Sequence, residues 1–357
     1  MGTRTYSVGI LGGTGIVGQR LVRRLENHPW FRLERLAASR RSIGRRYGDA
    51  VNWTLGGQPP AFAADMEVVP CEPESLAGCD LVFSSLDSAV ARDVEASFSR
   101  AGIHVISNSS AYRMDPGVPL VIPEVNASHL ELLPGEPAAG RTGHIVTNPN
   151  CSVIGLAIAL APLHQEFGVQ AAVVTTLQAL SGAGLSGPSR EEMEDNALPH
   201  IRGEEEKIQA ELPKILGRLD GAGGIEPAEI KVAAHCNRIG TVDGHLETVS
   251  VRLDRAATPQ QAVEAFNRYR GEIEGLNLPS APAKPIQVLD QPDRPQPRLD
   301  RDTGEGMTVV IGRVRPCPVT TLRFCLLSHN TERGAAGAAL LNGELMAVRG
   351  LLGRKSS

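Results

Sequence analysis

Cys151 is the residue whose surroundings most suggest covalent chemistry. It stands in the segment Thr147–Ser152, directly before an apolar run with helical spacing, Val153–Leu163. A thiol at the start of a helix lies near the positive end of the helix dipole, which favours the thiolate. A single cysteine can equally be a small buried side chain. The nucleophile hypothesis therefore requires that the chain also supply a base and an anion site.

The segment Asn237–His245 offers a candidate for each of these roles. A histidine with a pKa near neutrality can take a thiol proton and later move protons at the reacting centre. An arginine can grip a carboxylate through two parallel hydrogen bonds. Of the nine histidines, His245 is the one that shares a loop with an arginine, Arg238, and two glycines. A purely structural role for this histidine stays open on these grounds alone.

A glycine-rich turn near the N-terminus indicates a dinucleotide site. Gly13–Gly18 fits GxGxxG between a short apolar run, Ser7–Leu11, and a helical pattern, Ile16–Leu25. In that context bare backbone can approach a pyrophosphate at a helix N-terminus. A lone GxGxxG also occurs as a tight packing turn, but the position between strand and helix favours the dinucleotide interpretation.

The next strand end predicts the choice of dinucleotide. An NAD site usually has an acidic residue about 20 residues after the glycines, which holds the ribose hydroxyls. Here the chain reads Ser39, Arg40, Arg41 and Ser42, with no carboxylate. Hydroxyl and guanidinium groups suit a 2′-phosphate, so we expect NADP. A solvated basic turn is the alternative.

The elements that would position these residues fall into two groups. In the first part of the chain, short apolar runs alternate with helical patterns, which predicts a doubly wound parallel sheet. From about Val173 longer strand patterns with fewer helices predict a mixed or antiparallel sheet. The Pro-rich segment Pro279–Pro297 is expected to be a surface excursion, and a helical pattern, Gly334–Leu352, is expected to pack back on the first part.

Composition excludes several classes of protein. The 357 residues predict two domains, because domains usually hold roughly 100 to 200 residues. A net charge of −4 gives no basic field for nucleic acid or anionic lipid, so a small-molecule ligand is expected. The six cysteines form no CxxC pair, and no long apolar run or secretory signal is present, which predicts free thiols, no metal site and a cytoplasmic location.

Eight segments together resemble the aspartate-semialdehyde dehydrogenase family, particularly its archaeal and fungal branch. In chain order they read GGTGIVGQ, SNSSAYR, VTNPNCS, TTLQALSGAG, EEEK, CNRIGTVDGH, DRPQPRLDRD and HNTERGAAGAA, and they cover about residues 6 to 350. The resemblance implies an N-terminal Rossmann domain plus an α+β catalytic and dimerisation domain, similar in plan to glyceraldehyde-3-phosphate dehydrogenase. The domains are placed at 1–148, completed by a C-terminal helix at 333–357, and at 149–332.

The resemblance also implies roles for single residues. Cys151 matches the nucleophile, His245 the acid/base, and Gln178 the residue that orients the intermediate. Arg238 matches the group that grips the substrate carboxylate. Other matches concern the rest of the substrate (Glu204, Lys207, Arg113, Asn108) and the cofactor (Gly12, Gly13, Thr14, Gly15, Ile16, Val17, Ser39, Arg40, Arg41, Ser42, Ser85, Ser181, Gly182, Asn330).

Two points stay open within this resemblance. Any of Glu204, Glu205 and Glu206 could face the substrate, because all three stand in one acidic run. The family commonly has a proline-containing segment between the arginine and the histidine, whereas this chain has Gly240 and Thr241. We therefore expect a looser loop there, which affects substrate choice.

The implied activity is the reversible, NADPH-dependent reduction of L-aspartyl 4-phosphate to L-aspartate 4-semialdehyde through a cysteine thioester. This reaction belongs to the biosynthesis of lysine, threonine, methionine and isoleucine, and the implied assembly is a homodimer or homotetramer. Malonyl-CoA reductase is the nearest rival, because only the leaving group differs. N-acetyl-glutamyl-phosphate reductase fits less well, since its nucleophile motif contains glycine. A non-catalytic dinucleotide-binding regulator is the alternative from another class.

Overall fold

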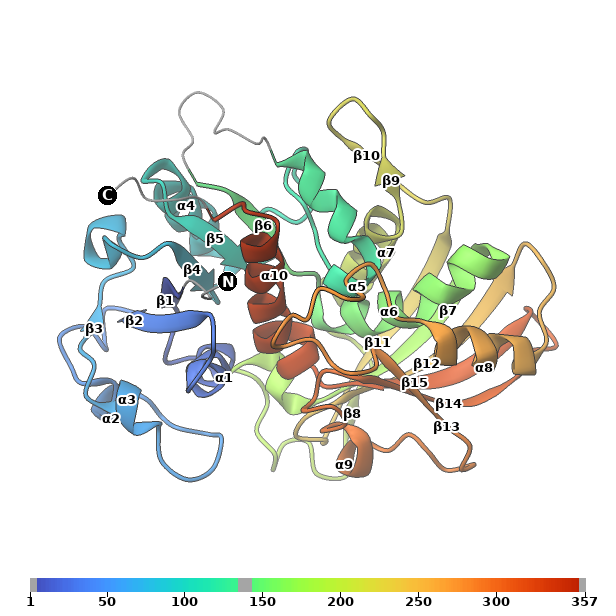
Figure 1. The fold of residues 1–357 in the computed structure, drawn as a ribbon. Helices are drawn as coiled ribbons and strands as arrows, with labels where there is room; N and C mark the ends of the chain where they lie inside the picture. Colours follow the sequence, from blue (N-terminus) through green and yellow to red (C-terminus); the bar gives the residue numbers. More distant parts are fainter. Residues whose placement is uncertain (1–4, 134–142, 353–357) are drawn as a thin grey trace.

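Two sheets organise the chain in the computed structural model, which describes residues 5–133 and 143–352 (Figure 1). The ends of the predicted domains at residues 1 and 357 lie outside the described residues. In the first sheet every strand pair is parallel and the order is β3-β2-β1-β4-β5-β6, the order of a doubly wound dinucleotide-binding sheet. Its strands are β1 (Tyr6–Leu11), β2 (Phe31–Ala37), β3 (Val68–Val69), β4 (Leu81–Ser84), β5 (His104–Ser107) and β6 (Ile145–Thr147).

The helices of this first lobe follow from amphipathic patterns. In α1 (Ile16–Leu25) the apolar side of the helix is buried, while Arg23 and Arg24 lie in its last turn. Helix α4 (Ser88–Arg100) buries Ala91 and Phe98 in the same way. The shorter helices are α2 (Tyr47–Ala50), α3 (Ala61–Ala64) and α5 (Pro123–Asn126), with 3-10 turns at Pro73–Leu76 and Ala127–Leu132.

The second sheet is mixed, as the strand patterns predict. Its order is β13-β14-β15-β12-β7-β11-β8; the pairs β11–β7 and β13–β14 are parallel and the others antiparallel. Its strands are β7 (Val169–Gln178), β8 (Ala197–Leu198), β11 (Lys231–Ile239), β12 (His245–Leu253), β13 (Ile286–Leu289), β14 (Val309–Pro316) and β15 (Leu322–Ser328), and a separate hairpin is formed by β9 (Arg218–Leu219) and β10 (Ile225–Glu226). The predicted fold class is confirmed.

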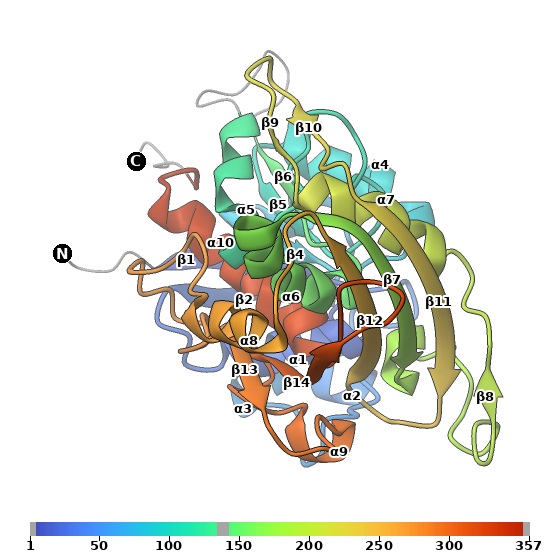
Figure 2. The same cartoon turned by 90° about the vertical axis from the view of Figure 1, so that its right-hand side faces the viewer.

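Helices cover one face of this sheet. Figure 2 shows α6 (Cys151–Phe167) and α8 (Pro259–Arg268) on one side of the long strands β7, β11 and β12. Helix α7 (Glu204–Ile215) packs against β11. Side chains on the opposite face, such as Val173, His235, Thr248 and Arg323, are exposed. The sheet therefore has one buried face and one open face.

The prediction of a surface excursion at Pro279–Pro297 is wrong for its centre. The four residues of β13 pair in parallel with β14 at the edge of the sheet. The prolines flank these four residues and do not interrupt them, and an edge strand tolerates that arrangement. Helix α9 (Pro297–Asp300) follows the segment.

The C-terminal part returns to the first lobe, as expected. A π-helical turn, Glu332–Ala336, precedes α10 (Gly337–Val348), which packs against α1, β4 and β5 (Figure 1). Ten residues of α10 are buried, which explains why it is mostly apolar on every side, and its two buried polar residues, Asn342 and Glu344, are hydrogen-bonded. Within the described ranges, no helix is both long and apolar enough to cross a membrane.

Candidate active site

A cavity of about 980 Å³ joins the glycine turn of the first lobe to Cys151 at the start of the second. Many of the residues that the sequence predicts for the site contribute to its wall. The predicted residues that line it are Gly12, Thr14, Gly15, Ile16, Val17, Ser39, Arg40, Ser85, Asn108, Arg113, Cys151, Ser181, Gly182, Glu204, Lys207 and Asn330. The structure therefore brings these cofactor and substrate residues to one continuous space, whereas Gln178, Arg238 and His245 are buried and are not among its lining residues.

The glycine turn fits a bound pyrophosphate. Gly12 has φ +82°, and a Cβ there would come within 2.8 Å of the Ser85 carbonyl oxygen. Glycine is therefore needed both for the backbone conformation and for the close approach. Helix α1 begins directly after this turn, so its first N–H groups, which have no partner within the helix, are available to an anion bound there.

The basic turn after β2 divides into two parts. Ser39 and Arg40 line the cavity. Arg41 is exposed and is not among the lining residues, and Ser42 is buried with its N–H donated to the Ser39 carbonyl oxygen. Gly13 also lies behind the wall, where its N–H binds the Ala37 carbonyl oxygen. Of the four residues in the turn, two are placed to meet a ligand.

Cys151 is the first residue of α6, which follows β6 after a short connection. Asn150 caps the helix, because its side-chain oxygen accepts a hydrogen bond from the Ser152 N–H. The Cys151 Sγ atom lies 3.2 Å from His245 Nε2. Two residues 94 positions apart in the chain thus form the thiol–imidazole pair that the sequence predicts.

The hydrogen bond on the other ring nitrogen defines the form of His245. Its Nδ1 atom accepts the backbone N–H of Ala179 at 3.1 Å, so the neutral ring carries its proton on Nε2, facing the sulfur. Burial, with Arg238 adding to it, lowers the pKa of His245 to about 3. This arrangement therefore presents a neutral histidine as a hydrogen-bond donor to the Cys151 sulfur.

The thiol of Cys151 is also neutral in this arrangement. Burial raises its pKa to about 12, and the Glu204 carboxylate acts in the same direction. Arg238, Arg113 and Lys207 act in the opposite direction but do not outweigh burial. The favourable position at the helix N-terminus is therefore outweighed by burial and does not yield a thiolate.

The glutamate that faces the site is Glu204. Its Oε2 atom accepts from Asn150 Nδ2 at 2.9 Å and from Gln178 Nε2 at 3.3 Å, and its Oε1 atom accepts from Lys207 Nζ at 2.8 Å. Glu205 instead binds the Cys236 N–H, and Glu206 is exposed. Although burial alone would raise it, Lys207 and the other donors bring the pKa of Glu204 below its usual value.

Gln178 and Arg238 come from the ends of two adjacent parallel strands. They are paired in register, Gln178 at the end of β7 and Arg238 on β11, and both are buried. Arg238 Nη1 donates to the Ala179 carbonyl oxygen. A Cβ on Gly182 would lie 2.9 Å from Arg238 Nη1 and 3.1 Å from His245 Cε1. Glycine at 182 therefore leaves room for both side chains beside the cavity.

The loop between Arg238 and His245 is held by backbone hydrogen bonds. The Thr241 and Val242 carbonyl oxygens accept from the N–H groups of Leu180 and Ser181, at 2.8 and 3.1 Å. These two bonds tie the loop to the turn that follows β7, and the expected effect of Gly240 and Thr241 on substrate choice stays a prediction. The same turn is joined to Asn330, whose Nδ2 donates to Ser181 Oγ at 2.8 Å.

Arg113 and Asn108 lie on the first-lobe side of the cavity. Arg113 Nη2 donates to the Asn108 carbonyl oxygen at 2.7 Å, and Asn108 Oδ1 accepts from Asn148. Arg113 Nη1 donates to Glu211 at 2.9 Å. Glu211 was missed in the sequence, although it lies seven residues after Glu204 and hence on the same face of α7.

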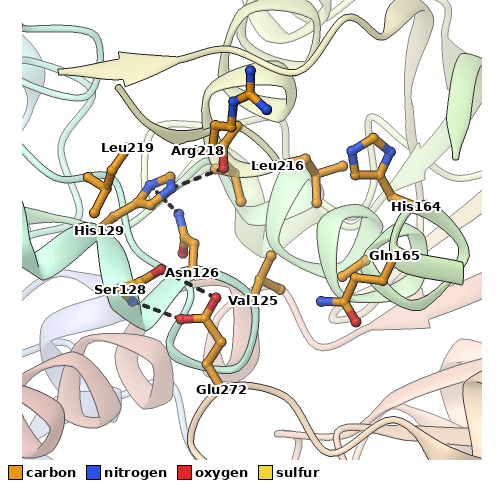
Figure 3. Close-up of a pocket in the computed structure, with 13 residues that line it drawn as sticks. Val125, Asn126, Ser128, His129, His164, Gln165, Leu216, Arg218, Leu219 and Glu272 are labelled. Atoms are coloured by element: carbon orange, nitrogen blue, oxygen red, sulfur yellow. Dashed lines mark hydrogen bonds between the residues drawn. The ribbon is translucent and has the colours of Figure 1, made fainter. Parts of the chain in front are cut away.

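A second, separate cavity of about 270 Å³ lies among α5, α6 and the end of α7 (Figure 3). Several of its polar groups are bonded to one another: His129 to Asn126 and to the Gly217 carbonyl oxygen, and Glu272 to Ser128. It shares no lining residue with the large cavity. The large cavity therefore remains the candidate active site. Among the described residues, no group of three or more metal-ligating side chains is found.

Comparisons with known proteins agree with this geometry. The family model described as "Semialdehyde dehydrogenase, NAD binding domain" matches residues 7–133, and "Semialdehyde dehydrogenase, dimerisation domain" matches residues 160–333. An aspartate-semialdehyde dehydrogenase of Archaeoglobus fulgidus is 48% identical over 96% of this chain and 98% of that protein. The Saccharomyces cerevisiae protein of that name is 42% identical, again over 96% and 98%.

A solved structure extends the similarity to three dimensions. The crystal structure of aspartate semialdehyde dehydrogenase with NADP from Candida albicans has a TM-score of 0.91 and 40% identity. It is matched over 97% of this chain and 100% of that one.

Proposed function

Because the chain belongs to the aspartate-semialdehyde dehydrogenase family, we propose that it reduces L-aspartyl 4-phosphate to L-aspartate 4-semialdehyde with NADPH, reversibly. The observation that carries the proposal is the 3.2 Å contact of Cys151 Sγ with His245 Nε2 at a cavity that also reaches the glycine turn. The reaction would serve the biosynthesis of lysine, threonine, methionine and isoleucine.

The residues present fit NADP. A Cβ at Gly12 would fill the turn, α1 begins beside it, and Ser39 with Arg40 offers a hydroxyl and a guanidinium for a 2′-phosphate. Ser181 and Asn330 lie at the other end of the cavity, near Cys151. When bound, the cofactor would supply the hydride in reduction and accept it in oxidation.

Cys151 would form the covalent intermediate. Its sulfur attacks the acyl carbon of the aspartyl phosphate, the carbon–oxygen bond to phosphate breaks, and the thiol proton leaves with the phosphate. Because the thiol proton leaves with the phosphate in this step, Cys151 can enter the reaction as a neutral thiol. The thioester then holds the acyl carbon beside the nicotinamide position, so that the reduction becomes intramolecular.

The other side chains bind and orient the substrate. Arg238 would hold its carboxylate, and Glu204 its amine. His245, with its proton on Nε2, would donate to the acyl oxygen as negative charge develops there. Arg113 and Lys207 would neutralise the phosphate.

The open face of the second sheet supports an assembly of like subunits. The family model of the dimerisation domain matches residues 160–333, which include this sheet. Side chains on the open face, such as Val173, are exposed. We propose that two copies pair through this face, as a homodimer or within a homotetramer, in the cytoplasm.

One assay tests the proposed reaction. Purified enzyme is given L-aspartate 4-semialdehyde, NADP and phosphate, in parallel with malonate semialdehyde, NADP and coenzyme A. We expect NADPH formation that depends on phosphate in the first mixture, because Arg113 and Lys207 line the cavity where the leaving group would lie. Coenzyme A-dependent turnover with malonate semialdehyde would instead identify a malonyl-CoA reductase. Lack of turnover in both mixtures would favour a non-catalytic regulator.

A further inference from the structure

Helix α7 carries a second pair of buried charges below the pair already placed in the site. Glu204, Lys207, Glu211 and Lys214 follow at intervals of three, four and three residues, which puts all four on one face of the helix. The first two contact the cavity. Glu211 and Lys214 are also buried, and neither is used by the reaction as described above.

Glu211 connects two parts of the active site. Its Oε1 atom accepts from Arg113 Nη1 at 2.9 Å, and its Oε2 atom accepts from the backbone N–H of Asn150 at 2.6 Å. Asn150 directly precedes the nucleophile Cys151. One carboxylate thus links the proposed phosphate ligand to the turn that presents the sulfur.

Lys214 holds the same arginine segment from the backbone side. Its Nζ atom donates to the carbonyl oxygens of Arg113 and Val118, at 2.6 and 3.1 Å. Helix α7 therefore fixes both the side chain and the main chain at Arg113. Because Glu204 on the same helix binds the Asn150 side chain, α7 sets the distance between the nucleophile turn and Arg113.

We propose that Glu211 is a positioning residue that holds Arg113 in register with Cys151 and thereby forms the phosphate subsite. The inference rests on the proposed function, since it takes Arg113 as the phosphate ligand. The role requires a carboxylate, because both of its partners are donors and each needs an acceptor oxygen. A glutamine at 211 has one acceptor oxygen, so its NH₂ group would face either Arg113 or the Asn150 N–H.

The sign of the effect separates positioning from simple charge. Removing the negative charge of Glu211 would relieve its Coulomb repulsion of phosphate. On charge alone, phosphate would therefore bind more tightly and its KM would fall. Loss of positioning does the reverse, since Arg113 loses the partner that aims it. The Nε atom of Arg113 is buried and has no hydrogen-bond partner, so the guanidinium is oriented by the bonds of Nη1 to Glu211 and of Nη2 to the Asn108 carbonyl oxygen.

The test measures the KM of phosphate in the oxidation of L-aspartate 4-semialdehyde by the full-length enzyme. We expect Glu211→Gln to raise this KM roughly tenfold, the loss expected for one charge-assisted hydrogen bond. The KM of the semialdehyde, which Arg238 holds, should change less than twofold. Glu206→Gln is the matched control, since Glu206 is exposed on the same helix, and it should leave both KM values unchanged.

A double-mutant cycle with Arg113→Met completes the test. If Glu211 acts through Arg113, Glu211→Gln adds little further loss in the Arg113→Met background. A lowered or unchanged KM of phosphate in Glu211→Gln, or fully additive effects, would overturn the proposal. If Glu211→Gln does not fold, Glu211→Asp keeps both oxygens at shorter reach, and an unaltered phosphate KM in that variant would equally overturn it. A wild-type enzyme without phosphate dependence would refute the proposed function instead.

Discussion

The protonation state of the Cys151–His245 pair is the main question at the scale of single residues. Many thiol–imidazole pairs work as ion pairs, with the cysteine pKa well below its ordinary value. Here burial acts on both partners in the direction of neutrality, raising the pKa of the thiol to about 12 and lowering that of the imidazole to about 3. The Ala179 N–H reinforces this state, because it occupies the Nδ1 lone pair.

The pH dependence of alkylation measures this state directly. Below its pKa a thiol gains thiolate tenfold per pH unit, so the rate of Cys151 modification by iodoacetamide should rise throughout pH 6 to 9 without a plateau. Cys317 is an internal control in the same protein, because hydrogen bonds from Thr320 and its neighbours lower its pKa to about 7, and its rate should level off above that pH. Peptide mass spectrometry separates the two sites. A plateau for Cys151 near pH 6 would show a thiolate–imidazolium pair.

Arg238 is expected to affect binding and turnover together. It is buried beside His245, and anchoring the substrate carboxylate would serve affinity and orientation alike. We predict that Arg238→Leu raises the KM of L-aspartate 4-semialdehyde and lowers kcat, each by at least about tenfold. Steady-state kinetics at saturating NADP and phosphate provide the measurement. Unchanged constants would place the carboxylate site elsewhere.

At the scale of elements, the turn after β2 shows how a local structure selects among similar residues. Arg40 and Arg41 are adjacent in the sequence and both are exposed, yet of the two only Arg40 lines the cavity. The first of the two can therefore reach a 2′-phosphate in that cavity.

Single substitutions in this turn should give unequal results. We predict that Arg40→Ala lowers the ratio of kcat/KM for NADP to that for NAD by at least about tenfold, or about 1.4 kcal/mol, since it removes a charge-assisted hydrogen bond. Arg41→Ala is the matched control and should leave the ratio nearly unchanged. Equal effects of both variants, or a wild-type preference for NAD, would mean that the turn does not select the cofactor.

At the scale of the whole molecule, buried charges join the two lobes. Arg20 on α1 donates to Glu332 and to Asp243, at 2.7 and 3.0 Å, and Asp243 lies two residues before His245. Arg333 makes two 2.8 Å bonds to Glu124 with both side chains fully buried. The bonds of Arg20 fix α1 relative to the loop before His245, and the Arg333–Glu124 pair fixes the π-helical turn before α10 relative to α5, because breaking a buried pair leaves an uncompensated charge.

Glu247 is a buried acid of a different kind, and it should make stability depend on pH. Both of its side-chain oxygens lack a hydrogen-bond partner, and burial raises its pKa well above the usual value. When the pKa of an acid is higher in the folded state than in the unfolded state, the folded protein is most stable below the unfolded-state pKa. This part of the free energy of unfolding is lost as the pH rises toward the folded-state pKa. The free energy of unfolding should therefore fall from about pH 5 upward.

Glu247→Gln should remove this dependence, because an amide does not titrate. The free energy of unfolding is measured by urea denaturation between pH 5 and 9. We predict that it falls less steeply with pH for the variant than for the wild type, with a difference in slope of up to about 1.4 kcal/mol per pH unit. Glu206→Gln, at an exposed position, should follow the wild type. Parallel pH curves for all three proteins would show that Glu247 is ionised or solvated in the folded state.

The sequence by itself determined the features that depend on short stretches of chain. The glycine turn between β1 and α1 and the helix that contains Val153–Leu163 follow from local spacing and turn chemistry. The ordered motifs predicted the fold class and singled out Cys151, His245 and Arg238, because each of these residues stands within a recognisable string.

The tertiary structure decided what depends on contacts between distant segments. Glu211 meets Arg113 across 98 residues and Arg20 meets Glu332 across 312, and no local pattern encodes such a partner. The choice of Glu204 from three glutamates, the exclusion of Arg41 from the cavity and the edge strand within the Pro-rich segment have the same origin. Helical spacing limits which residues share a face, but only packing determines what that face contacts and which charges lose their water.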